Sequence, residues 1–157
     1  MTESLVVISR SEAETHALGT KLGKLLPDGI VVALNGPLGA GKTRLVQAIA
    51  ATRGIDPRDV VSPTYTLVQE YHGTGNIFHF DAYRLVDDDE FLNLGPEEYF
   101  AAGGLTIIEW AEKVQACLPR RRLEITIRPL DVAVREFTLA GFGPEAAEIV
   151  KLLHAEN

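Results

Sequence analysis

Cysteine is nearly absent from this chain of 157 residues, in which Cys117 is the single example. One cysteine excludes an internal disulfide, a Cys-x-x-Cys redox pair and a cysteine zinc cluster. Long hydrophobic runs are also missing: the longest clear run, Ile30–Leu34, is far shorter than the roughly 20 residues of a membrane-spanning helix. The first residues lack the basic stretch of a secretory signal. We therefore expect a soluble, cytoplasmic protein with no membrane association.

Positive charge is also scarce. The chain has 15 Lys and Arg against 22 Asp and Glu, which gives a net charge of −7. Such a chain does not coat nucleic acid through a general positive field, so any contact with RNA is local or runs through a basic partner. Arg120–Arg122 is a candidate for a local contact, although such runs are more typical of a solvated turn.

The residues that are abundant are those of an ordinary globular protein, with 46% hydrophobic and 24% charged residues. Ile30–Leu34 and Leu105–Ile108 are apolar without alternation, which is typical of strands buried on both faces. Lys42–Arg53 has helical periodicity, and Arg122–Arg128 and Val134–Ala140 alternate like strands joined by a turn. These patterns predict a single α/β domain over residues 1–157, with a largely parallel sheet flanked by helices and antiparallel strands at one side.

A phosphate-binding motif follows the first buried strand. Gly36–Thr43 matches G-x-x-x-x-G-K-[ST] in full. Its glycines allow the backbone amides to surround a phosphate, Lys42 places a charge on the β- and γ-phosphates, and Thr43 offers a hydroxyl to Mg²⁺. The flanking strand and helix disfavour the alternative of a purely structural turn. Together with the predicted sheet, the motif predicts a P-loop NTPase-like fold. The residues of this motif expected to bind nucleotide are Gly36, Leu38, Gly39, Ala40, Gly41, Lys42 and Thr43.

The identity of the nucleotide follows from a missing motif. Asn-Lys-x-Asp, which recognises guanine, does not occur in the chain. ATP and its product ADP are therefore the expected ligands.

An enzyme of this class needs an acidic residue at the end of a neighbouring strand to hold Mg²⁺ or a water molecule. Glu109 ends the apolar run Leu105–Ile108, and Asp81 ends Ile77–Phe80. His79 interrupts the second run, so we expect that strand to expose one face and His79 to be half-buried. We assign Glu109 to Mg²⁺ with Thr43, and Asp81 to a second metal-side or water-orienting role. Either acid can alternatively cap a helix.

Two further features leave alternatives open. Ser62, Thr64 and Thr66 lie around Pro63 and form a candidate switch, because small hydroxyls in such a loop can reach the γ-phosphate. An ordinary turn stabilised by Ser and Thr is the other interpretation. Trp110, directly after Glu109, belongs either to the core or to a lid over the site.

The order of four sequence blocks is specific. These blocks are Leu34–Thr43, Ser62–Val68, His79–Leu85 and Ile108–Lys113. On these blocks the chain resembles, over about residues 5–150, the bacterial TsaE proteins, also called YjeE. Two small departures are Pro37, where an acidic residue is usual, and Ala111, where Pro or Ser is common.

The resemblance implies a function. TsaE proteins are small P-loop ATPases needed for threonylcarbamoyladenosine (t6A) formation on tRNA, with slow, Mg²⁺-dependent hydrolysis that a TsaB–TsaD complex activates. Lys42, Asp81 and Glu109 match the family's catalytic positions, and Thr43 and Glu109 match its Mg²⁺ positions. Glu12 and Arg135 match positions that approach the nucleotide from outside the P-loop. The resemblance also favours the switch role of Ser62–Thr66.

Two other functions compete with this interpretation. A small-molecule or nucleoside kinase of the P-loop class needs an acceptor pocket and an arginine-bearing lid, for which only Arg120–Arg122 is a candidate. A nucleotide-sensing adaptor that never hydrolyses ATP is the second, and the two acids Asp81 and Glu109 argue against it.

Overall fold

The computed structural model describes residues 2–37, 39–61, 63 and 66–156, so Leu38, Ser62 and Thr64 lie outside the described residues. The strands are β1 (Thr2–Ser9), β2 (Val31–Asn35), β3 (Val68–Tyr71), β4 (Ile77–Asp81), β5 (Leu105–Glu109), β6 (Arg122–Pro129) and β7 (Arg135–Phe142). The α-helices are α1 (Glu12–Leu25), α2 (Lys42–Ala51), α3 (Asp88–Leu92), α4 (Pro96–Phe100) and α5 (Pro144–Ala155). Two short 3₁₀ helices are η1 (Pro57–Asp59) and η2 (Ala111–Cys117).

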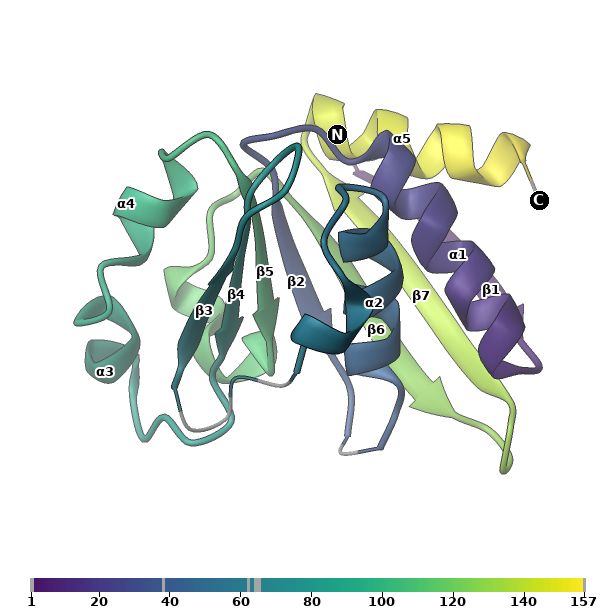
Figure 1. The fold of residues 1–157 in the computed structure, drawn as a ribbon, viewed down its shortest axis with the longest axis horizontal. Coiled ribbons are helices and arrows are strands. Elements are labelled where there is room, and N and C mark those ends of the chain that lie inside the picture. Colours follow the sequence, from purple (N-terminus) through teal and green to yellow (C-terminus); the bar gives the residue numbers. More distant parts are fainter. Residues whose placement is uncertain (1, 38, 62, 64–65, 157) are drawn as a thin grey trace.

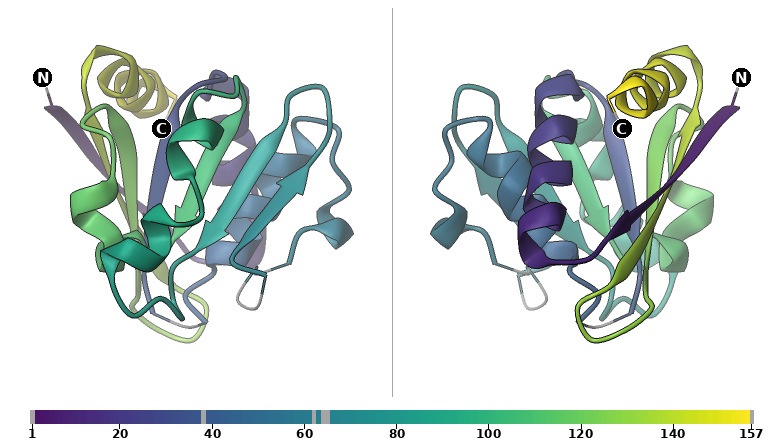
Figure 2. Two further views of the ribbon diagram at one scale, coloured as in Figure 1. Left: turned by 90° about the vertical axis from the view of Figure 1, so that its left-hand side faces the viewer. Right: turned by 90° about the vertical axis from the view of Figure 1, so that its right-hand side faces the viewer.

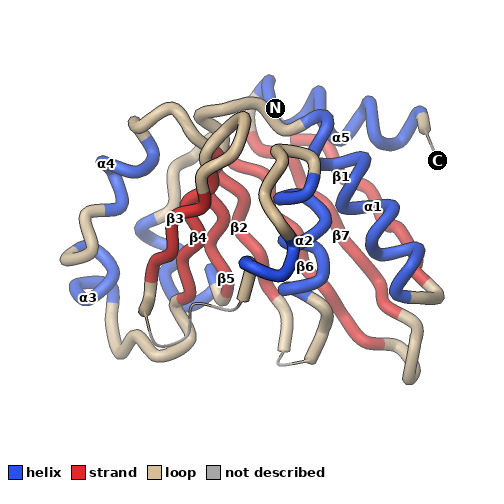
Figure 3. Tube along the Cα trace, in the orientation of Figure 1, coloured by secondary structure: helices blue, strands red, loops and turns tan. Residues whose placement is uncertain are grey.

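One sheet runs through the molecule, with its strands in the order β1-β7-β6-β2-β5-β4-β3 (Figures 1 and 3). The central strands β6, β2, β5 and β4 are parallel to one another. Antiparallel pairs lie at both edges, where β7 joins β6 and β1, and where β3 forms a hairpin with β4. The predicted α/β class with a parallel centre and flanking helices is confirmed.

Helices cover both faces of this sheet (Figure 2). On one face, apolar residues of α1, α2 and α5, such as Leu22, Leu45 and Ile149, pack with residues of the sheet in one buried cluster. On the other face, Phe91 of α3 and Val114 of η2 belong to a second buried cluster. Within the described residues, no helix is long and apolar enough to span a membrane.

Burial on both faces explains why the central strands read as apolar runs, since neither face of such a strand meets water. Every residue of β4 and of β5 is buried. The expectation that β4 exposes one face is therefore wrong. The polar His79 that suggested it is fully buried, because a partner on β5 satisfies it.

The carboxyl ends of β2, β4 and β5 lie together at the same end of these parallel strands, the lower end in Figure 1. Asp81 of β4 lies directly beside Glu109 of β5, and Glu109 lies beside Leu34 of β2. The loop that follows β2 contains the phosphate-binding motif. The parallel register thus brings both candidate acids, far apart in sequence, to the carboxyl end of the strands, from which that loop emerges.

Candidate functional site

The phosphate-binding loop adopts backbone conformations that its glycines permit. Gly36 has a φ of 150°, and a Cβ there would lie 2.8 Å from the carbonyl oxygen of Ile127 on β6. Gly41, with a φ of 101°, is the N-cap of α2. Both are conformations that L side chains rarely adopt, so the glycines allow the loop to turn tightly from strand into helix. The amino end of α2, with its partial positive charge, consequently faces the site.

Lys42, the first residue of α2, is only 6% exposed. Its ammonium group donates to the carbonyl oxygens of Gly36 and of Pro37, the latter at 3.1 Å. The same nitrogen lies 4.1 Å from the centre of the Trp110 ring, a cation–π contact. Burial lowers the pKa of Lys42, while the nearby carboxylates, led by Glu109, raise it. The lysine is thus held by the loop's own carbonyls and by an aromatic ring.

Both candidate acids are buried, each with 2% of its surface exposed. One carboxylate oxygen of Asp81 accepts the backbone N–H of Tyr83 at 2.8 Å. One carboxylate oxygen of Glu109 lies 2.5 Å from Nε2 of His79. Equal burial means that burial cannot decide which acid binds Mg²⁺. Strand order does distinguish them, because Glu109 is on the strand next to β2 and Asp81 is one strand farther away.

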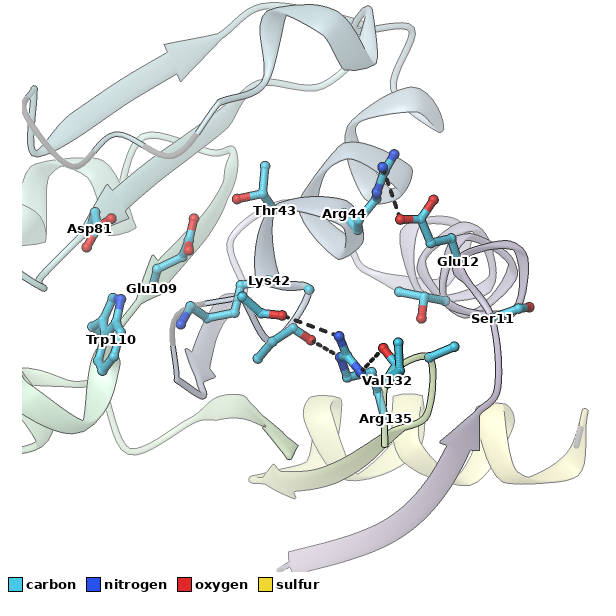
Figure 4. Close-up of a pocket in the computed structure, with 15 residues that line it drawn as sticks. Ser11, Glu12, Lys42, Thr43, Arg44, Asp81, Glu109, Trp110, Val132 and Arg135 are labelled. Atoms are coloured by element: carbon cyan, nitrogen blue, oxygen red, sulfur yellow. Dashed lines mark hydrogen bonds and ion pairs between the residues drawn. The ribbon is translucent and has the colours of Figure 1, made fainter. Parts of the chain in front are cut away.

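These groups surround a cavity of about 450 Å³, a volume typical of small-molecule sites. Figure 4 shows Thr43, Glu109 and Asp81 at one end of it, and Ser11, Glu12 and Arg135 at the other. The expected site residues that line the cavity are Glu12, Gly39, Ala40, Gly41, Lys42, Thr43, Asp81, Glu109 and Arg135. The structure therefore brings together residues from the beginning, middle and end of the chain.

Two arginines also line the cavity, and each already interacts with other groups of the protein. Arg135 donates to the carbonyl oxygens of Ala40 at 3.1 Å and Gly39 at 3.4 Å, so it braces the phosphate-binding loop from β7. Arg44 of α2 forms an exposed ion pair with Glu12 of α1 at 3.2 Å. The helix bearing Glu12 begins at Ser11, whose side chain accepts the N–H of Glu14 in the S-x-x-E pattern typical of a helix start.

Other expected residues lie outside the cavity lining. The Gly36 carbonyl contacts Lys42, but the residue itself is not part of the lining. Thr66 is exposed, and its hydroxyl donates to Gln69 at 3.2 Å. The other members of the candidate switch, Ser62 and Thr64, lie outside the described residues, as does Leu38.

The structure gives the positions of two residues that the sequence does not predict correctly or at all, Trp110 and His79. Trp110 lines the cavity, and its ring contacts the ring of Tyr83 at 4.8 Å between centres. His79, expected to be half-buried, is fully buried and bonded to Glu109. No local pattern reveals this second contact, because the two residues are 30 positions apart and meet only through the register of β4 and β5.

The donor chemistry at the cavity fits a nucleotide with Mg²⁺. The hydroxyl of Thr43 and the carboxylates of Glu109 and Asp81 are oxygen groups, which Mg²⁺ prefers. Among the described residues, no group of three His, Cys, Asp or Glu side chains could hold a metal by itself.

Comparisons with known proteins find similarity to one family along most of the chain. Residues 9–137 match the family model described as threonylcarbamoyl adenosine biosynthesis protein TsaE. The tRNA threonylcarbamoyladenosine biosynthesis protein TsaE of Treponema pallidum is 41% identical over 133 residues, or 85% of this chain and 98% of that one. The protein of the same name from Bacillus subtilis is 38% identical, over 83% and 81%. The crystal structure of Bacillus subtilis YdiB superimposes with a TM-score of 0.82 at 28% identity, covering 99% and 97%.

Proposed function

Because this chain belongs to the TsaE family of threonylcarbamoyl adenosine biosynthesis proteins, we propose that it is a P-loop ATPase acting in that modification of tRNA. It binds ATP with Mg²⁺ in the cavity between the phosphate-binding loop, the ends of β4 and β5, and the β6–β7 turn. The observation that carries the proposal is the convergence of a complete phosphate-binding motif, a buried lysine and two buried carboxylates on one cavity.

The proposed roles follow from the chemistry of each group. Lys42 exchanges its contacts with the loop carbonyls for the β- and γ-phosphate oxygens, which are stronger, charged acceptors. Thr43 and Glu109 hold Mg²⁺, which neutralises charge on the phosphates when it is bound. Asp81, one strand farther from the loop, orients the attacking water. Glu12 and Arg135 contact the nucleotide from α1 and from β7.

Hydrolysis by the protein alone is proposed to be slow. Transition-state charge on the γ-phosphate is stabilised well only when an arginine reaches it, an effect of about 10³–10⁵ in rate. Of the arginines at the cavity, Arg44 is paired with Glu12, and Arg135 is bonded to backbone carbonyls. We therefore propose that a TsaB–TsaD complex activates turnover, by supplying an arginine or by acting on the candidate switch.

Contact with tRNA is proposed to run through those partners. The net charge of −7 opposes binding of a polyanion. Of the candidate basic run, Arg122 is bonded to Glu124 at 2.7 Å and stacks on Phe142, so it is already engaged in the fold.

The proposal is tested by calorimetric titration of the protein with ADP and with a non-hydrolysable ATP analogue, each with and without Mg²⁺. We expect binding of both, stronger for the ATP analogue when Mg²⁺ is present, and no tight binding of tRNA at physiological salt. Absence of nucleotide binding under all conditions would refute the proposal. ATP consumption that rises with a small-molecule acceptor, rather than with protein partners, would indicate a kinase.

A further inference from the structure

A chain of polar contacts runs from the site into the buried part of the sheet. Glu109 lies at the cavity, and its carboxylate is 2.5 Å from Nε2 of His79. The other ring nitrogen of His79, Nδ1, lies 3.3 Å from the hydroxyl of Tyr71 on β3. The single hydrogen of that hydroxyl is donated to the backbone carbonyl of Val61 at 3.2 Å, so the hydroxyl can accept from Nδ1 but cannot donate to it at the same time. Three neighbouring strands thus connect the cavity to the segment that precedes Ser62.

We propose that His79 positions the Glu109 carboxylate for Mg²⁺, and that Tyr71 fixes the His79 ring and ties this pair to the backbone at Val61. The inference rests on the proposed function, since it concerns the same metal ion. His79 and Tyr71 are positioning residues, because both act through Glu109.

The chemistry of Glu109 explains why it needs such a partner. An ionised carboxylate only accepts hydrogen bonds, so Nε2 of His79 is the donor in this contact. The bond occupies one carboxylate oxygen and leaves the other as a metal ligand. Residues that orient a metal ligand in this way matter nearly as much as the ligand, and their loss typically costs about 10–100-fold in metal affinity or activity.

Burial makes the contact exclusive. His79 is 0% exposed and Glu109 is 2% exposed, so water cannot readily replace a missing partner. The aromatic ring of Tyr71 packs beside the imidazole, with 5.9 Å between ring centres. The ring of His79 is therefore held from both nitrogens and from one side.

Hydrogen bonds of the residues on either side of 62–66 link this segment to the rest of the site. On the amino side, the Val61 carbonyl accepts from Tyr71, and the Val60 carbonyl accepts from Gln47 of α2 at 3.0 Å. On the carboxyl side, the Leu67 carbonyl accepts the N–H of Asp81 at 2.9 Å. The amino flank is thus tied to β3 and α2, and the carboxyl flank is tied to β4, the strand that carries Asp81. A change in the Glu109 carboxylate is transmitted to Val61 through His79 and Tyr71.

Two substitutions of one residue separate this role from simple core filling. His79→Gln places an amide nitrogen near the position of Nε2, so the contact with Glu109 can persist. His79→Asn reaches only the position of Nδ1, so the contact with Tyr71 can persist while the contact with Glu109 is lost. A core-filling histidine would respond mainly to the change in volume, which is larger for Asn.

The measurement is the ratio of nucleotide dissociation constants without and with Mg²⁺, using the non-hydrolysable ATP analogue, with thermal unfolding recorded for each variant. We expect His79→Gln to keep the ratio within about threefold of the unmodified chain, and His79→Asn to lower it about tenfold or more. Affinity without Mg²⁺ stays similar in both variants. An unchanged ratio in a folded His79→Asn protein, or equal loss in both variants in proportion to lost stability, would overturn the proposal.

Tyr71→Phe tests the second half of the chain and remains decisive if His79→Asn does not fold. It removes only the hydroxyl, and Tyr99→Phe is a matched control because Tyr99 packs against Phe78 and Phe80, on the other face of the sheet. Hydrogen exchange is followed in the peptide that covers Val61–Leu67. We expect Mg²⁺ with the ATP analogue to protect this peptide in the unmodified chain and in Tyr99→Phe, but clearly less in Tyr71→Phe. Equal protection in all three would contradict the coupling. A chain that binds no nucleotide at all refutes the proposed function itself, and the inference with it.

Discussion

Replacing Lys42 with alanine removes the positive charge that lies deepest in the cavity. Three acidic and three basic side chains line this cavity, so the lining is balanced in formal charge. Without Lys42 the balance becomes negative, which opposes a polyphosphate ligand. The two remaining basic groups, Arg44 and Arg135, are held by Glu12 and by backbone carbonyls, so neither replaces the lysine without breaking existing contacts.

The expected magnitude follows from the contacts of the ammonium group. In the protein alone, Lys42 donates to neutral carbonyls of Gly36 and Pro37. Exchanging these for charged phosphate oxygens gives a charge-assisted bond worth about 1.5–3 kcal/mol. Loss of one such bond corresponds to roughly a tenfold to 150-fold weaker affinity. The lost balance of charge adds to this figure.

The assay is calorimetric titration with the ATP analogue and Mg²⁺. Lys151→Ala, on the exposed side of α5, removes the same charge away from the cavity and serves as the matched control. We expect the control to bind like the unmodified chain. Thermal unfolding shows whether Lys42→Ala still folds, as expected while Arg135 braces the loop. A folded Lys42→Ala protein with unchanged affinity would refute the assignment of the phosphate-binding loop.

Other predictions concern the acids, the thiol and a buried arginine. Glu109→Gln should weaken nucleotide binding mainly in the presence of Mg²⁺, whereas Asp81→Asn should mainly slow hydrolysis; the reverse pattern in calorimetry and turnover would exchange their roles. Burial raises the pKa of the Cys117 thiol, so less thiolate is present, and iodoacetamide at neutral pH should alkylate it more slowly than free cysteine. Arg53, 9% exposed, bonds an aspartate and a backbone carbonyl, so Arg53→Ala should lower the free energy of unfolding in urea by about 1–3 kcal/mol. Arg58→Ala, which removes an exposed arginine that pairs with Asp56, should leave the free energy of unfolding nearly unchanged.

The part of the site that the sequence predicts is the part made by local chemistry. Gly36 and Gly41 stand where the backbone takes values that favour glycine, and Lys42 begins the helix directly after them. A turn of this kind depends on adjacent residues, so its pattern can be recognised in the sequence alone. The apolar runs of β2 and β5 likewise indicate central strands, because burial on both faces leaves no alternation.

The parts that the sequence misjudges depend on contacts between distant segments. His79 interrupts an apolar run, and polar residues within such runs usually mark an exposed face. Here the register of β4 with β5 supplies Glu109 as its partner, so the histidine is buried without penalty. The sequence does not decide whether Trp110 belongs to the core or to a lid, for the same reason. The position of its ring depends on Lys42 and Tyr83, which lie elsewhere in the chain.

Burial does not distinguish Glu109 from Asp81 as the metal ligand. The sequence favours Glu109 because it predicts the more buried strand there, but both strands are fully buried. Strand order now supports the same choice, since β5 pairs directly with β2 and β4 does not. Such order is set by long-range pairing, which no short pattern in the sequence reports.

The most direct test of the proposed function is the rate of ATP hydrolysis by the protein alone, with the TsaB–TsaD pair added, and with the pair added to Lys42→Ala. We expect slow turnover by the protein alone and a rise of an order of magnitude or more when the pair is added. A supplied arginine can raise the rate by roughly 10³-fold or more. We expect no rise for the variant. Rapid turnover by the protein alone, or a rate that the pair leaves unchanged, would contradict partner-activated hydrolysis.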